Sequence, residues 1–207
     1  MKISLKTIDS LSTIQRRINV AIAKEVNVLI NQKVTHIKNK VKDLAASWVM
    51  VQPEMIALSN NTLAAELGLV FGSAASSIEA IAASVQGAIN VKVTKVDNKL
   101  QGGLTLEFLP SDFANLLGLT QGHTRIKDGG DLHWLRWLLL EGYKMIVVNY
   151  HFEAKAGEGR SRGGVMTKGG SWRIPPEYAG TEDDNFITRA FSGKEKEITQ
   201  VIKAALS

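Results

Sequence analysis

Residues 9–46, DSLSTIQRRINVAIAKEVNVLINQKVTHIKNKVKDLAA, contain neither glycine nor proline. Their apolar residues recur at steps of three and four, which predicts a long amphipathic helix with one apolar stripe, begun by Asp9 or Ser10 as the cap. The stripe comprises Ile8, Leu11, Ile14, Ile18, Ile22, Val26, Leu29, Val34, Ile37, Val41 and Leu44. A single helix of this length extends roughly 55 Å, more than the diameter of a compact domain of this size. We therefore expect either a partner chain along part of it or a break near Asn31.

The positive charge of the chain is concentrated in the same segment. The 25 Lys and Arg outnumber the 20 Asp and Glu, which gives a net charge of +5. Residues 1–47 contain nine of the basic and three of the acidic side chains, so the rest of the chain is close to neutral. Four basic residues share the helix face opposite the stripe: Arg17, Lys24, Lys38 and Lys42. This face is either solvated or a surface for DNA or for an acidic partner.

Residues 48–207 are expected to form an α+β body in the same domain as the helix of residues 1–47. Alternating β-branched residues predict one hairpin within 88–109 and a second hairpin region within 144–174. In the second region we expect Gly169-Gly170 to form a turn between two short strands. Short helices are expected at the C-terminus. The predicted class is α+β, with the long N-terminal helix packed on a small antiparallel β-sheet.

Several kinds of chemistry are not expected. The chain has no cysteine, which excludes a disulfide scaffold, a thiol nucleophile and a cysteine-based zinc site. The spacing of the four histidines predicts no zinc motif, and the apolar runs are too short to cross a membrane. We expect no cofactor, no metal and no enzymatic activity. The alternative is an enzyme with an unrecognised site around His123, Asp128 and Asp131.

Two charged segments near the C-terminus are candidate contact surfaces. Arg160 and Arg162 lie in the glycine-rich stretch GEGRSRGG at 157–164. They are candidates for phosphate contacts, for contacts with an acidic patch of a neighbouring subunit, or for a solvated loop. The acidic run Glu182, Asp183 and Asp184 is a candidate for that patch. It also fits the cap of a short helix over 185–191, with Asp183 or Asp184 at the N-cap.

Three stretches together carry a resemblance to a known family. The first is PEMIAL at 53–58, leading to LAAELGL at 63–69. The second is WLLLEG at 137–142, followed by GRSRGGVM at 159–166. The third is WRIPPEYAGT at 172–181, followed by NFITRA at 185–190 and a terminal helix. In this order they resemble the neck or tail-completion proteins of tailed bacteriophages, whereas residues 72–130 have no counterpart in the resemblance.

The resemblance implies a viral structural protein without catalytic residues, located in the virion neck and assembled in the host cytoplasm. It implies a homo-oligomeric ring, six-fold, in the head–tail connector, with a tail-completion or tail-terminator role. The partners would be other copies of the chain and the adjacent portal-side and tail proteins, with non-specific contact to DNA in the lumen and no membrane. The alternative function is a nucleic-acid-binding module that uses the basic helix face and the arginine loop.

Overall fold

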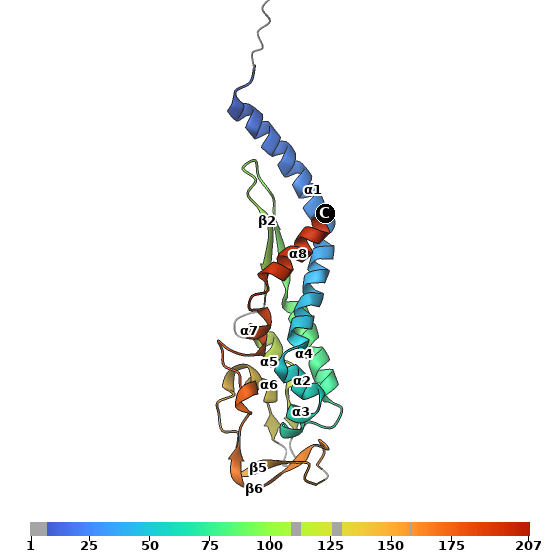
Figure 1. The fold of residues 1–207 in the computed structure, drawn as a ribbon, viewed down its shortest axis with the longest axis vertical. Helices are drawn as coiled ribbons and strands as arrows, with labels where there is room; N and C mark the ends of the chain where they lie inside the picture. The colour runs from blue at the N-terminus through green and yellow to red at the C-terminus, as the bar shows by residue number, and fades with distance from the viewer. Residues whose placement is uncertain (1–7, 109–112, 126–129, 158) are drawn as a thin grey trace, which may run out of the picture. The chain divides into compact units, whose positions relative to one another are not determined.

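The computed structural model describes residues 8–108, 113–125, 130–157 and 159–207 of the chain (Figure 1). Its helices are α1 (Leu11–Met50), α2 (Pro53–Ser59), α3 (Thr62–Glu66), α4 (Ala74–Ala88), α5 (Ala114–Leu117), α6 (Trp134–Arg136), α7 (Phe186–Phe191) and α8 (Glu195–Leu206). Single 3-10 or π turns are η1 (Thr120–Gly122), η2 (Trp137–Glu141) and η3 (Pro176–Tyr178). The strands are β1 (Asn90–Thr94), β2 (Gly103–Glu107), β3 (Thr124–Arg125), β4 (Asp131–Leu132), β5 (Val147–Ala154) and β6 (Gly164–Trp172), and they pair antiparallel as β1–β2, β3–β4 and β5–β6. The protein is therefore α+β, with a long N-terminal helix, small antiparallel sheets and short C-terminal helices.

The chain divides into two compact units. Unit 1 comprises the described residues of Met1–Val41, Asn90–Phe108 and Lys196–Ser207, and unit 2 those of Lys42–Ile89 and Leu109–Glu195. Helix α1 runs from one unit into the other. None of the helices in the described part of the chain combines the length and the hydropathy that a membrane crossing requires.

Helix α1 is continuous from Leu11 to Met50, so the break considered near Asn31 is not present. At its start, Oγ of Ser10 accepts a hydrogen bond from the backbone amide of Thr13 at 3.2 Å, which identifies Ser10 as the capping residue. No helix breaker interrupts the 40 residues that follow, and the interior hydrogen-bond ladder is therefore unbroken.

The buried face of α1 differs from the predicted stripe. The buried positions are Ala23, Ile30, Ile37, Val41, Ala45, Ala46, Trp48 and Val49. The C-terminal part of the stripe, with Ile37 and Val41, is buried as expected, but Leu11, Ile18 and Ile22 are exposed. The stripe prediction failed in the first half of the helix because it counted large apolar residues, whereas the contact there is made at Ala23, a small residue.

The β1–β2 hairpin packs on this part of α1. The side chain of Asn27 donates to the carbonyl of Val96 at 2.9 Å and accepts from the Val96 amide at 2.8 Å. Val96 is buried with Ala23 and Ile30, and Leu104 packs against them. An asparagine side chain on the helix thus satisfies both backbone groups of one hairpin residue, which fixes the hairpin on α1 in unit 1.

Unit 2 holds most of the fully buried large side chains. Helix α2 contacts α3 and α4, α5 contacts α4 and α6, and α7 contacts η2. The largest fully buried side chains of this unit are Met55, Leu58, Leu63, Ile81, Ile89, Leu116, Trp134, Leu135, Leu138, Leu139 and Phe186. The chain crosses itself closely after η2, where the Gly142 amide donates to the Gly180 carbonyl at 3.0 Å.

The β5–β6 hairpin corrects the expectation for Gly169-Gly170. Val148 pairs with Ser171 and Tyr150 with Lys168, so both glycines face the single residue Asn149 as a bulge inside β6. Both have positive φ. The segment that connects the two strands is instead the arginine-bearing stretch after Ala154. Two adjacent glycines fit a bulge as well as a turn, and the longer pairing with β5 decides between them.

Candidate interaction surfaces

The basic face of α1 is only partly free. Arg17 and Lys24 are exposed, whereas Lys38 and Lys42 are half-buried. Nη1 of Arg17 forms an ion pair with Oδ2 of Asp9 at 2.6 Å, on the surface. Exposed pairs of this kind contribute little to stability. Of the four predicted residues, Arg17 and Lys24 are therefore the ones most open to an acidic partner.

Arg160 is anchored to the backbone. Its Nε donates to the carbonyl of Gly68 at 2.6 Å, Nη1 to the carbonyl of Arg125, and Nη2 to Oγ1 of Thr124 at 3.2 Å. All three guanidinium nitrogens thus bond groups of the protein itself, from two segments far away in sequence. A guanidinium engaged in this way holds the fold together and leaves little capacity for a phosphate.

The same segment is fixed to α3 on its other side. Nδ2 of Asn61 donates to the carbonyl of Ser161 at 2.9 Å, and Ser161 is buried. A Cβ on Gly163 would lie 2.3 Å from the Cβ of Ala65, so this glycine permits the close approach to the helix. Arg160 is exposed, Ser161 is buried and Gly163 is half-buried, so the segment is held to the fold at the surface by these contacts.

Arg162 differs from Arg160. It is exposed, has a φ of 55°, and its guanidinium carbon lies 5.0 Å from the ring centroid of Phe71. This is the geometry of a cation–π contact, and among the described residues no hydrogen bond engages the guanidinium N–H groups, so they can bind another molecule. Arg162 is the member of the predicted arginine pair that can contact a neighbouring subunit or a phosphate.

The acidic run also separates into different roles. Glu182 and Asp183 are exposed, whereas Oδ1 of Asp184 pairs with Nη1 of Arg189 at 2.5 Å. The N-cap of α7 is Asn185 and neither aspartate. Oδ1 of Asn185 accepts from the amides of Ile187 and Thr188, and Oγ1 of Thr188 accepts from the Asn185 amide at 2.9 Å. This reciprocal arrangement is a capping box, and the Asn-x-x-Thr spacing was its signal in the sequence.

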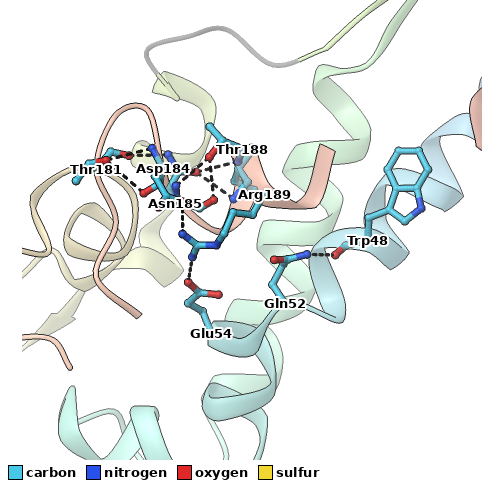
Figure 2. A network of polar contacts seen from close by, with 9 residues as sticks. Trp48, Gln52, Glu54, Thr181, Asp184, Asn185, Thr188 and Arg189 are labelled. Atoms are coloured by element: carbon cyan, nitrogen blue, oxygen red, sulfur yellow. Dashed lines mark hydrogen bonds and ion pairs between the residues drawn. The ribbon is translucent and has the colours of Figure 1, made fainter. Parts of the chain in front are cut away.

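Arg189 joins this capping region to a buried acid, as Figure 2 shows. Its Nη2 donates to Oε1 of Glu54, whose side chain is 0% exposed. Oε2 of Glu54 is buried without a hydrogen-bond partner among the described residues. Burial raises the pKa of Glu54, against the smaller lowering effects of its own backbone amide and of Arg189. Sequence reasoning gave Glu54 and Arg189 no role, although both lie in the stretches that carry the family resemblance.

The histidine cluster gives a partial structural basis for the enzyme alternative. Nδ1 of His123 lies 2.6 Å from Oδ2 of Asp131, and the His123 and His133 rings stack with centroids 3.9 Å apart. Burial, followed by the charge of His123, lowers the pKa of His133. Asp128, the third residue of that hypothesis, lies outside the described residues. In the described ranges no hydroxyl bonds His123, and no group of three His, Cys, Asp or Glu could hold a metal ion.

Exposed apolar side chains that the sequence did not single out occur on and beside one hairpin. They lie on β5–β6 and just before it: Tyr143, Met145, Val148, Tyr150 and Met166. Val148 is 65% and Tyr150 39% exposed. Within the described strands this sheet has two members only, so both edges carry unpaired backbone groups.

Known proteins were compared with the chain by family, by sequence and by structure. No protein-family model, curated protein or solved structure matches the chain.

Proposed function

We propose that this chain is a structural virion protein of a tailed phage that forms a homo-oligomeric, six-fold ring in the neck. Its role there is tail completion or tail termination, between the portal-side connector and the tail. Two things support the proposal: the resemblance carried by residues 53–69, 137–166 and 172–190, and the surface of the β5–β6 hairpin. The surface of the β5–β6 hairpin is the observation that supports assembly into a ring.

A two-stranded antiparallel sheet with exposed apolar residues calls for a partner. Isolated pairs of strands are marginally stable in water and gain stability when a further layer or strand covers them. Strand β6 contacts α3, where Nε1 of Trp172 donates to Oε2 of Glu66 at 3.1 Å, and the apolar side chains that stay exposed can be covered by a second copy. Val148, Tyr150 and Met166 leave apolar area in water on this hairpin. In a ring, each subunit presents the same hairpin to the next one, so a head-to-tail contact buries that area in every copy.

Charged groups on the same unit suit such a contact. Arg162 keeps its N–H groups available above Phe71, and Glu182 and Asp183 are exposed. Opposite charges of neighbouring copies would favour one register of the ring over others. Outside residues 1–47 the chain is nearly neutral, which suits a lumen through which DNA passes without adhering.

The experiment is a mass measurement of the full chain by light scattering, with negative-stain images of the same sample. We expect closed rings in the wild type and their loss in Tyr150→Lys, which places a charge in the contact. Met50→Lys is the matched control, because Met50 is an exposed apolar residue of unit 2 on α1. A protein that stays monomeric and is absent from purified virions contradicts the proposal.

A nucleic-acid-binding module is the second candidate, and the exposure of Arg17 and Lys24 favours it. The anchoring of Arg160 removes one residue from that hypothesis. Binding through the four basic residues of α1 predicts a log–log salt slope of about −3 to −4. Replacing Arg17 and Lys24 by alanine should reduce the slope by about 2. Absence of binding at low salt eliminates this candidate.

A further inference from the structure

A row of apolar side chains along the first half of α1 is largely exposed in the described part of unit 1. Leu11 is 83%, Ile18 48% and Ile22 43% exposed, and the half-buried Leu29 continues the row. These residues share one face of the helix. The face that packs on the β1–β2 hairpin, with Ala23 and Ile30, is rotated from it by roughly 110°.

The row has a symmetric pattern. With the two exposed polar residues between its members it runs Leu11, Gln15, Ile18, Ile22, Glu25 and Leu29. The steps are four, three, four, three and four residues, and the residue types run apolar, polar, apolar, apolar, polar, apolar. Steps of this kind are those of a coiled-coil seam. The order of apolar and polar residues in the row is therefore the same when it is followed from either end, and the centre of this symmetry is position 20.

We propose that α1 pairs with α1 of a second copy of this chain, antiparallel, about a two-fold axis at the level of residue 20. Leu11 then faces Leu29 of the second copy, and Ile18 faces Ile22. Gln15 faces Glu25, and the amide of one donates to the carboxylate of the other. Each layer of the seam is matched in polarity.

Charge selects this orientation and this occupant. A parallel pair in register would place Glu25 against Glu25, two like charges in the seam, which is unfavourable. In the antiparallel pair each Glu25 has an amide opposite. The positions that flank the seam, among them Ile14, Asn19 and Ala21, carry no charge. Arg17 and Lys24 lie more than roughly 100° around the helix, so the pairing leaves them in water.

This contact is independent of the proposed ring. A two-fold pairing uses the same patch on both copies, whereas a cyclic ring uses two different patches. The helix pair involves residues 11–29 of unit 1, and the ring contact involves the hairpin of unit 2. The variant Tyr150→Lys removes the ring contact alone, so the helix pairing is measured in that background. If the ring does not form, the helix pairing can still be tested. If the helices do not pair, the ring can still be tested.

Sedimentation of the full chain with Tyr150→Lys tests the pairing. A helix pair of this length is a small interface, so we expect a dissociation constant on the order of 10 µM. Ile18→Lys should weaken the dimer by at least about 100-fold, because the charge would be buried in the seam. Val20→Lys is the matched control: Val20 is also exposed but lies on the other side of the helix, and dimerisation should be unchanged. A monomer at about 200 µM, or a dimer unaffected by Ile18→Lys, overturns the proposal.

Cysteine cross-linking tests the orientation, and the chain has no cysteine of its own. Ala21→Cys lies beside the axis, so two copies should cross-link through this position with a short bis-maleimide. Leu11→Cys should not cross-link to itself, because the two copies of residue 11 would be about 27 Å apart. Cross-linking through Leu11→Cys, or through neither position, contradicts the antiparallel pair. Circular dichroism of each variant checks that the helix content is unchanged.

Discussion

Arg189 on α7 donates to the buried carboxylate of Glu54 on α2, across 135 residues of sequence. The same guanidinium reaches Asp184, so one arginine joins a buried acid to an exposed one. Figure 2 shows this bridge beside the capping box of α7. It makes Arg189 a central polar link of unit 2.

Arg189→Ala should lower the free energy of unfolding of unit 2 by about 2–3 kcal/mol, because it leaves the Glu54 carboxylate buried and unpaired. All four tryptophans lie in unit 2, so urea unfolding followed by tryptophan fluorescence reports this unit. Asp184→Asn is the control: Asp184 is 71% exposed, and its loss should cost less than about 1 kcal/mol. Equal effects of the two variants would show that burial of Glu54 does not matter.

The raised pKa of Glu54 predicts a pH dependence. A carboxyl group whose folded pKa lies above its unfolded value, 4.5, binds its proton more tightly in the folded state. Its contribution to stability is therefore complete below pH 4.5 and is lost as the pH rises through the folded pKa. Glu54→Gln cannot titrate, so the stability of the wild type relative to this variant should fall as the pH rises above 4.5. A relative stability that rises with pH in this window would contradict the assignment.

Arg160 and Arg162 are two residues apart and should respond differently to alanine. Arg160→Ala removes three hydrogen bonds and should destabilise unit 2 by about 1–3 kcal/mol. Arg162→Ala removes a cation–π contact at the surface and should cost about 0.5–1 kcal/mol. Urea midpoints by tryptophan fluorescence compare them. If Arg160→Ala had the smaller effect, its role as an anchor would be wrong.

Gly180 lies where the chain passes over η2. A Cβ at this position would be 1.8 Å from the carbonyl oxygen of Leu138, a backbone atom that cannot turn aside. Gly180→Ala should therefore destabilise unit 2 by about 1–3 kcal/mol. Gly87→Ala is a matched control inside α4, with open space around the new methyl group. It should stabilise by about 0.5–1 kcal/mol, and thermal unfolding of both variants gives the comparison.

The sequence was informative where the pattern is local. Alternation of β-branched residues predicted the hairpin that contains Val91 and Val93. The absence of breakers predicted a long helix, but it left open the break near Asn31 that the continuous α1 does not have. For the first half of α1, the face that becomes buried could not be predicted from the sequence. Large exposed residues such as Leu11 and Ile18 dominate the pattern, whereas the contact depends on Ala23 and on the amide of Asn27. The choice of Ala23 and Asn27 as contact residues is determined by how the β1–β2 hairpin packs on α1, which the periodicity of the sequence does not show.

The candidate surfaces were predictable in composition but not in role. The stretch around Arg160 was identified by its glycines and arginines. Its anchoring depends on the carbonyls of Gly68 and Arg125, groups that every residue has and that no sequence pattern marks. In the same way, the pairing of Arg189 with Glu54 depends on how α7 and α2 meet. Only the Asn185–Thr188 cap had a local signature, and the neighbouring acidic residues obscured it.

The proposed assembly is tested most directly by the solution mass of the full chain at tens of micromolar, measured by multi-angle light scattering. A ring predicts a mass several times the 22.5 kDa of one chain, with closed rings in negative-stain images, and a return to small species in Tyr150→Lys. A mass of one chain throughout, together with absence of the chain from purified virions, contradicts the ring, and a mass of one chain at about 200 µM also contradicts the pairing of α1. A mass of two chains and no more would contradict the ring and leave only the pairing of α1.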